Sequence, residues 1–263
     1  MYKKLIQISY ALPQLYGQIK VHKPEAPMRP VVAYFTAPTY KLSKYLSRWF
    51  LAVTGFVGTY SIKNSIDLVT KLNQTKLPVG SILVSFDVKS MYTCIPVASS
   101  IQLMISTLKQ KNIPDNIIKE FQKLVTLCLA NNVCIYRKKK YRFPDGLPMG
   151  GPLSPLVAEI FMTHLEETIL HSHSLATHVR SWYRYVDDVL CIWRGPRSDL
   201  EVFLEHLNRF HPAISFTMDI GGEKISYLDL NIKLEEQDIV LKTSFSIYPV
   251  SYTHLTLPTI YSV

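Results

Sequence analysis

The sequence lacks the features that mark membrane, disulfide-rich and zinc-binding proteins. No apolar run reaches the roughly 18 residues that a membrane span needs, and the opening MYKKLIQISYALPQLYG contains no signal-peptide core or cleavage site. The four cysteines show neither C-x-x-C spacing nor a regular framework, so no zinc site or disulfide scaffold is indicated. We therefore expect an intracellular, soluble protein with reduced thiols and no membrane partner.

Acidic residues are scarce relative to basic ones. The chain has 20 Asp and Glu against 29 Lys and Arg, which gives a formal net charge of +9. This balance suits a polyanionic partner such as nucleic acid, although many basic proteins bind nothing acidic. At 263 residues and 48% hydrophobic, the chain can bury the core of one or two subdomains.

Hydrophobic periodicity predicts a mixture of strands and helices. Apolar residues recur at helical spacing in segments 40–53, 61–73, 98–111, 115–131 and 198–210. Short β-favouring runs predict strands in segments 16–34, 81–88, 132–146, 179–195, 214–220 and 225–234. Ser154, followed by Pro155, is predicted to cap a further helix. The order of these elements favours an α+β fold whose helices pack on one face of a sheet.

The carboxylates Asp187 and Asp188 lie between two strand-forming segments in RYVDDVLCIW, which predicts a hairpin with both acids at its turn. A bare Asp-Asp pair is more often a simple turn former. Two acids inside an otherwise apolar hairpin, however, cost several kcal/mol unless a cation or partner compensates. Phosphoryl transfer uses two divalent ions about 3.5–4 Å apart, and carboxylates are the ligands that Mg²⁺ prefers. Asp87, which ends the run SILVSFD, is the best third carboxylate.

Three ordered motifs resemble those of reverse transcriptases: SFDVKSMYTCIP, GLPMGGPLSPLVAEIFM and RYVDDVLCIW. The segment YGQIKVHKPEAPMRPVVA is similar to a signature of the Penelope-like retroelement branch, a group related to telomerase reverse transcriptases. The resemblance covers about residues 16–249. It implies a right-hand polymerase fold with fingers and palm, an antiparallel palm sheet with helices packed on one face, and a missing thumb.

The resemblance also implies a domain division. Residues 1–80 would form part of the fingers and residues 81–249 the palm, with a fingers-like insertion at about 97–145. The last fourteen residues, 250–263, contain no Lys, Arg, Asp or Glu. We interpret them as the translation of a sequencing adapter, so that the natural sequence would end near position 248 or 249. The chain would then be a fragment that lacks the thumb and the GIY-YIG endonuclease domain usual in that branch.

Site residues follow from the resemblance position by position. Asp87 and Asp187 match the two principal metal ligands, Asp188 the auxiliary acid, and the carbonyl of Val88 a backbone metal ligand. Tyr92 matches the aromatic gate that selects deoxynucleotides, although an ordinary buried tyrosine would fit its spacing equally. The remaining positions implied to contact the incoming nucleotide are Lys20, Lys23, Arg29, Met149 and Gly150. Arg29 is favoured over Lys20 and Lys23 because its planar guanidinium can donate two hydrogen bonds to one phosphate group. Gly146 and Gly151 lie where the backbone would approach nucleotide and template closely.

The function implied is RNA-directed DNA polymerisation by a retroelement core, with two Mg²⁺ ions or substituting Mn²⁺. Its partners would be an RNA template, a DNA primer and dNTPs, and its location the nucleus of a eukaryotic host. Two alternatives stay open: an RNA-dependent RNA polymerase, against which Tyr92 argues, and a non-catalytic fragment that binds RNA through basic fingers. The sequence leaves the oligomeric state undetermined.

Overall fold

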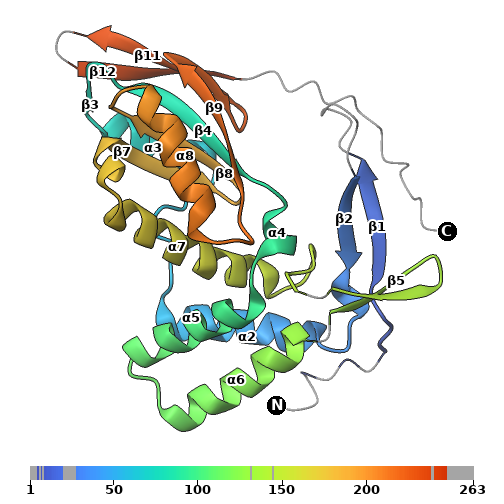
Figure 1. The fold of residues 1–263 in the computed structure, drawn as a ribbon. Helices are drawn as coiled ribbons and strands as arrows, with labels where there is room; N and C mark the ends of the chain where they lie inside the picture. The colour runs from blue at the N-terminus through green and yellow to red at the C-terminus, as the bar shows by residue number, and fades with distance from the viewer. Residues whose placement is uncertain are drawn as a thin grey trace.

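The central element of the fold is an antiparallel sheet, seen in the computed structural model of Figure 1. The structure describes residues 5, 7, 9–19, 28–130, 132–143, 145–237 and 240–247. In the central sheet the strand order is β7-β8-β4-β9. These strands span Val179–Tyr185, Asp188–Trp193, Ile82–Val88 and Phe216–Gly222. The segments that the sequence analysis predicted as strands around the acids thus pair with one another.

Both faces of this sheet are buried, which explains why its inner strands are apolar without interruption. In β8, Val189, Cys191 and Trp193 belong to one hydrophobic cluster, whereas Leu190 and Ile192 belong to another. Successive side chains of a strand point to opposite faces, so a strand covered on both sides needs apolar residues at every position.

Helices cover the first face of the sheet. Long helices contribute to the hydrophobic cluster that contains Val189, Cys191 and Trp193. They are α2 (Tyr40–Thr54), α5 (Val97–Gln110), α6 (Asp115–Ala130), α7 (Ser154–Ser172) and α8 (Ser198–Phe210). Phe203 of α8 packs edge-on against Phe86 of β4 and Trp182 of β7, with ring centroids 6.2 and 6.4 Å apart. This aromatic group fixes α8 on the sheet, and the helix ends where the sequence pattern predicted.

A second sheet and helix α3 (Ser65–Gln74) cover the other face. This sheet has the order β10-β11-β12-β3, with strands Lys224–Tyr227, Leu230–Gln237, Val240–Ile247 and Leu77–Pro78. Leu68 and Leu72 of α3 share a buried cluster with Leu83, Leu190 and Ile232. The region that the resemblance assigns to the palm is therefore a layered α+β structure, as predicted, with an additional sheet behind the central one.

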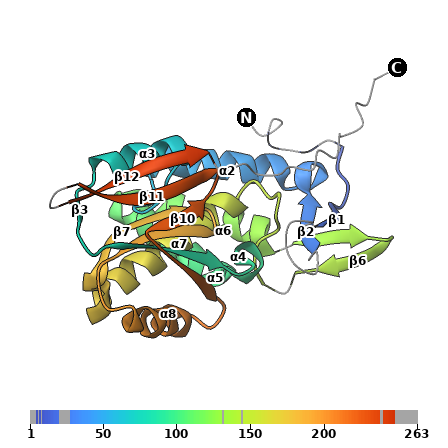
Figure 2. The ribbon, with the colours of Figure 1, turned by 90° about the horizontal axis from the view of Figure 1, so that it is seen from above.

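A third sheet stands apart from the palm, as Figures 1 and 2 show. Its order is β2-β1-β5-β6, with strands Met28–Ala33, Gln14–Ile19, Val133–Tyr136 and Lys139–Arg142. Strands β1 and β5 are parallel and meet where Gln14 pairs with Ile135. Residues from the early chain and from the middle of the chain therefore form one sheet, which we call the fingers sheet after the resemblance. Short elements complete the fold: Tyr34–Thr36, Met91–Cys94 (α4) and Ser174–His178.

Some local predictions need correction. Ser154 is the first residue of α7 and not its N-cap, because its hydroxyl donates to the carbonyl of Pro148 at 2.8 Å instead of accepting a helix N–H. Helix α3 begins at Ser65, later than predicted, because the Asn64 side chain accepts from the Asp67 N–H and caps it. The suspected adapter tail, 250–263, lies outside the described residues. Among the described residues, no helix is both long and apolar enough to cross a membrane.

Candidate active site

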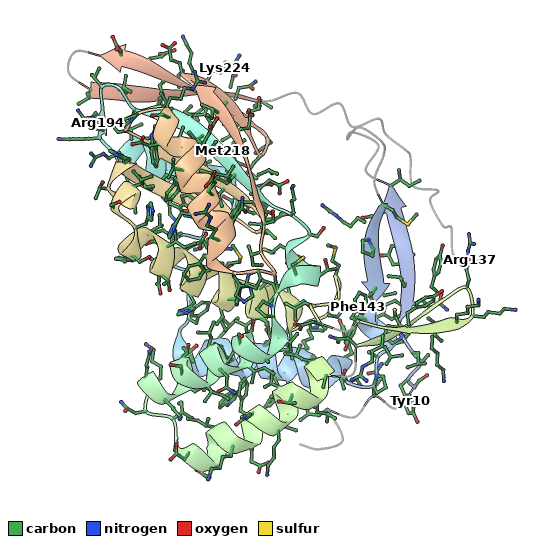
Figure 3. The ribbon with its side chains drawn as sticks, viewed as in Figure 1. Tyr10, Arg137, Phe143, Arg194, Met218 and Lys224 are labelled. Atoms are coloured by element: carbon green, nitrogen blue, oxygen red, sulfur yellow. The ribbon has the colours of Figure 1, made fainter. Side chains whose placement is uncertain are left out.

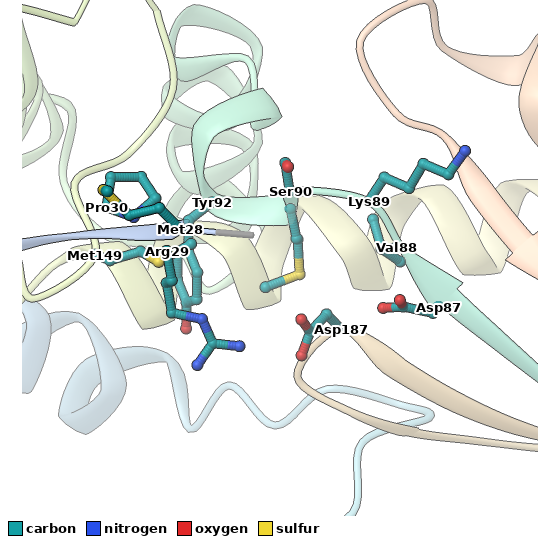
Figure 4. Close-up of a pocket in the computed structure, with 11 residues that line it drawn as sticks. Met28, Arg29, Pro30, Asp87, Val88, Lys89, Ser90, Tyr92, Met149 and Asp187 are labelled. Atoms are coloured by element: carbon teal, nitrogen blue, oxygen red, sulfur yellow. The ribbon is translucent and has the colours of Figure 1, made fainter. Parts of the chain in front are cut away.

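Asp187 lies in the two-residue loop between β7 and β8, and Asp188 is the first residue of β8. Across the sheet, Asp188 pairs with Asp87 near the end of β4. The Val88 N–H donates to the Asp187 carbonyl at 2.9 Å and so anchors the loop to β4. Asp87, Val88 and Asp187 line one pocket of about 450 Å³, into which both carboxylates point in Figure 4. Asp188 is exposed and is not among the residues that line this pocket.

The loop that carries Asp187 has an unusual backbone. Val186 adopts φ 58°, a left-handed conformation that is rare for a β-branched residue. Such strain costs about 1–3 kcal/mol and persists only where neighbouring contacts enforce it. The Tyr227 hydroxyl donates to the Asp188 carbonyl at 2.9 Å, and the Arg184 guanidinium donates to the Val186 carbonyl at 3.3 Å. These contacts, together with the Val88 bond, hold the loop on three sides.

Arg184 belongs to a buried ionic network beneath the loop. Its side chain is 1% exposed and donates to Glu159 at 2.9 and 3.0 Å and to Glu166 at 2.7 Å. Trp182 also donates to Glu166 at 2.9 Å, and Ser61 donates to Glu159. Burial opposes the charge of Arg184, but the two carboxylates outweigh it and raise the guanidinium pKa. Burial raises the pKa of Glu166, against the effect of Arg184. The network ties α7 and Ser61 to strand β7, which leads into the loop that carries Asp187.

Sequence reasoning missed this network. Glu159 and Glu166 are seven residues apart on α7, whose other buried positions are mostly apolar, and Arg184 interrupts a strand of aromatic residues. Charges at helical spacing within an apolar stripe are the signal that could have indicated buried partners.

The predicted nucleotide-binding residues surround the same space as the acids. Two adjoining pockets share Arg29, Tyr92, Met149 and Asp187, and Gly150 lines the second of them. Figure 4 shows the Arg29 guanidinium extending from β2 into the space before Asp187. The structure therefore brings a cation, an aromatic ring and two acids together, from segments distant in the sequence. Lys20 and Lys23 lie outside the described residues.

Tyr92 lies in α4, directly after β4, and is partly buried beside the pocket. Burial raises the pKa of its hydroxyl, and the charges of Asp187 and Glu159 raise it further. The backbone carbonyl of Tyr92 accepts from the Leu147 N–H at 2.6 Å. The tyrosine is thus held between the acids and the loop that precedes α7.

Glycine is required at two positions of that loop for a reason internal to the protein. A Cβ on Gly150 would lie 2.3 Å from the Val32 carbonyl, and a Cβ on Gly146 would lie 2.2 Å from the Thr93 carbonyl. Both glycines have positive φ, 110° and 83°. The Val32 N–H also donates to the Met149 carbonyl at 2.8 Å, so the loop and strand β2 are in direct backbone contact. In the described structure, the close approach is to the chain's own backbone.

Replacing Gly150 by alanine should therefore lower the free energy of unfolding by about 1–3 kcal/mol, the cost of a strained backbone conformation. The clash of the added methyl group with the Val32 carbonyl should lower it further. Gly55 is the matched control, because it also has positive φ but nothing lies within 4 Å of the place that an added methyl group would occupy. Urea unfolding of both variants measures the difference. Equal losses at the two positions would contradict a specific contact between the loop and β2.

The pocket offers the chemistry of a hard divalent cation. Asp87 and Asp187 contribute carboxylate oxygens, and Mg²⁺ is commonly held by one or two carboxylates together with water and substrate phosphates. Within the part of the chain that the structure describes, no group of three or more His, Cys, Asp and Glu side chains is arranged to hold a metal. Two acids from the protein, completed by substrate oxygens, are the donor set that fits this site.

A sheet with acids at adjoining strand ends, faced by a second sheet that carries a cation, is the arrangement that the motif resemblance implies for a template-directed nucleic-acid polymerase. The family described as reverse transcriptase (RNA-dependent DNA polymerase) matches residues 21–234. The chain belongs to the reverse transcriptase family. A comparison with curated protein sequences finds no match.

Solved structures share the fold at low sequence identity. Telomerase from Candida tropicalis, truncated from its C-terminal domain, has a TM-score of 0.60 and 13% identity, over 92% of this chain and 56% of that chain. The same telomerase with a TWJ fragment of telomeric RNA has a TM-score of 0.57 and 15% identity, over 98% and 47%. The RNA polymerase complex inside a double-stranded RNA virus has a TM-score of 0.54 and 10% identity, over 88% and 22%. This chain spans about half the length of the telomerase chains.

Proposed function

We propose that this chain is the fingers and palm core of a retroelement reverse transcriptase that transfers nucleotides from dNTPs to a primer 3′-hydroxyl on an RNA template. The observation that carries the proposal is that Asp87 and Asp187, from adjacent strands, line one pocket with Arg29 and Tyr92. The family match supports the same activity. The Penelope-like assignment rests on the sequence resemblance of residues 16–33.

Each of the gathered residues has a part in this reaction. Asp87 and Asp187, with Asp188 as an auxiliary acid and the Val88 carbonyl as a backbone donor, would hold two Mg²⁺ ions. Bound Mg²⁺ supplies activation of the primer oxygen and neutralisation of charge on the leaving pyrophosphate. Arg29 would bind the triphosphate with its planar fork. Catalysis then consists mostly of positioning and electrostatic stabilisation by groups already in place.

Tyr92 would select the sugar, because its ring stands between the acids and the Met149 loop that bounds the nucleotide pocket. A ribose 2′-hydroxyl would collide with this ring. Replacing Tyr92 by alanine should therefore raise rNTP incorporation relative to dNTP incorporation by about 10-fold or more, which corresponds to roughly 1.4 kcal/mol in the ratio of specificity constants. Single-nucleotide extension with dNTP and rNTP measures the ratio. An unchanged ratio would reduce Tyr92 to a packing residue.

Extension of a DNA primer on an RNA template by this chain, with Mg²⁺ and either dNTPs or rNTPs, tests the proposed activity. Extension with dNTPs supports reverse transcription. Extension with rNTPs alone supports the second candidate, an RNA-dependent RNA polymerase, which the fold likeness to a viral RNA polymerase favours. Template binding without extension would support the alternative in which this chain binds RNA without catalysing extension.

A further inference from the structure

Tyr227 is the last residue of strand β10 and contacts the hairpin that carries the acids. Figure 3 shows Lys224, the first residue of the same strand, at the end of the palm that lies away from Arg137 of the fingers sheet. Tyr227 is 4% exposed and shares a hydrophobic cluster with Leu83 of β4 and Leu190 of β8. The residue therefore reaches the central sheet from the second sheet, on the face opposite the long helices.

The Tyr227 hydroxyl contacts both strands of the β7–β8 hairpin, one on each side of the loop. It donates to the Asp188 carbonyl of β8 at 2.9 Å and lies 3.3 Å from the Tyr183 carbonyl of β7. Burial and the charge of Asp188 raise the pKa of this hydroxyl, against a hydrogen bond with the Tyr185 backbone, which lowers it. The hydroxyl therefore keeps its proton, and remains a donor, at neutral pH.

Packing alone does not account for this hydroxyl. A phenylalanine ring would fill the same cluster without burying a polar group that needs a partner. The partners of the hydroxyl belong to the hairpin and include the residues of the pair Tyr185–Asp188, which closes the two-residue loop. The turn that follows Tyr227 is held in place as well, because Ser65 of α3 donates to the Asp229 carboxylate. The ring can therefore impose a position on the hairpin.

The loop that this pair closes needs such support. Val186 has φ 58°, which a β-branched residue rarely adopts, so the loop sequence does not favour the conformation that the loop has. Asp187, the next residue, is one of the two acids that line the pocket. Mg²⁺ demands near-ideal octahedral geometry from its ligands, and a misplacement of about 1 Å at a reacting centre can cost about 100-fold in rate. A contact that fixes the loop would therefore control the rate of the reaction.

We propose that Tyr227 is a positioning residue, whose hydroxyl holds the closing pair of the β7–β8 hairpin so that Asp187 in the loop faces the pocket. The effect on the reaction rests on the proposed function, whereas the effect on the loop does not. Tyr227 is not among the residues that line the two pockets, so it acts through the backbone of Asp188 and not by contact with substrate.

Tyr227→Phe in the full chain removes the hydroxyl and keeps the ring. Single-nucleotide extension should show kcat lowered about 10-fold and the KM for dNTP changed less than about 2-fold, because the pocket walls that bind dNTP stay in place. Tyr183→Phe is the matched control, since its hydroxyl lies 3.1 Å from the Thr75 hydroxyl and its ring packs against the same cluster. Equal losses of kcat in the two variants would overturn the proposal, because they would reflect stability alone.

Amide hydrogen exchange of residues 185–189 gives a readout that does not depend on catalysis. Tyr227→Phe should speed exchange in this segment about 10-fold, the factor expected for one lost hydrogen bond, and Tyr183→Phe should not. Unchanged exchange in Tyr227→Phe would overturn the proposal. Faster exchange in a chain that extends no primer would support the role of Tyr227 in the loop and contradict only the proposed catalysis.

A double variant tests whether the effect passes through the strained turn. Asparagine adopts positive φ more readily than valine, so the loop of Val186→Asn should need less support. Adding Tyr227→Phe to Val186→Asn should then lower kcat by less than about 3-fold, since the two changes act on one element and are not additive. A full 10-fold loss in this background would show that Tyr227 does not act through the turn and would overturn the proposal.

Discussion

Replacing Asp187 by asparagine should lower the rate of primer extension by about 10²- to 10³-fold, a loss comparable to removal of one electrostatic element in other active sites. Asparagine has the same shape as aspartate, so the β7–β8 loop and the Val88 contact to the Asp187 backbone should be kept. What is lost is one of the two carboxylates that line the pocket. Template affinity should stay nearly unchanged.

Single-turnover extension and a parallel RNA-binding measurement separate the two effects. Asp219→Asn is the matched control, because Asp219 is an exposed acid on β9 of the same sheet and does not line the pocket. A variant that keeps the wild-type extension rate would show that the metal assignment of Asp187 is wrong.

Replacing Arg184 by methionine should destabilise the fold by about 3–5 kcal/mol, the usual cost of removing one partner from a buried ion pair. The change leaves Glu166, whose side chain is 1% exposed, without the guanidinium that lies 2.7 Å away. Arg209→Met is the control, because Arg209 is 80% exposed and pairs with Glu205 along one helix. The Arg209→Met change should lower the free energy of unfolding by at most about 1 kcal/mol. Urea unfolding measures both.

The pH dependence of the Arg184→Met variant should identify Glu166 as the cause. Burial raises the pKa of Glu166 in the folded state above the ordinary 4.5, and loss of Arg184 should raise it further. Between the unfolded-state and folded-state pKa values the folded state binds more protons than the unfolded state, so stability falls as pH rises above 4.5. Adding Glu166→Gln should restore stability and remove this pH dependence. A double variant as unstable as the single one would point to lost packing instead.

The acids and their strands could be predicted from sequence because local pattern determines them. An apolar run ending in Asp87 and a turn at Asp187 are both encoded within about ten residues. The orientation of Asp188 could not be predicted in this way. Asp188 pairs with Asp87 across the sheet, but it does not line the pocket that Asp87 and Asp187 line, and this difference depends on the conformation of the β7–β8 loop.

Contacts between distant segments could not be predicted in the same way. The joining of β1 with β5 depends on one short parallel pairing across about 120 residues, and no local pattern encodes it. The partners of Arg184 likewise come from another element, α7. The motif indicated that glycine is needed at position 150. The physical reason is contact with the Val32 carbonyl, which requires β2 to lie against the loop and is therefore not encoded locally.

The contact between Val32 and the Met149–Gly150 turn has a mechanical consequence. Strand β2 contacts the loop that leads into α7 at two points. The Val32 N–H donates to the Met149 carbonyl at 2.8 Å, and Gly150 packs so closely against the Val32 carbonyl that no methyl group would fit between them. Any rotation of the fingers sheet that preserves this contact must carry Arg29 and Met149 together, since Arg29 lies on the joined strand and Met149 in the joined turn. In any such rotation, two walls of this pocket would move together relative to Asp87 and Asp187.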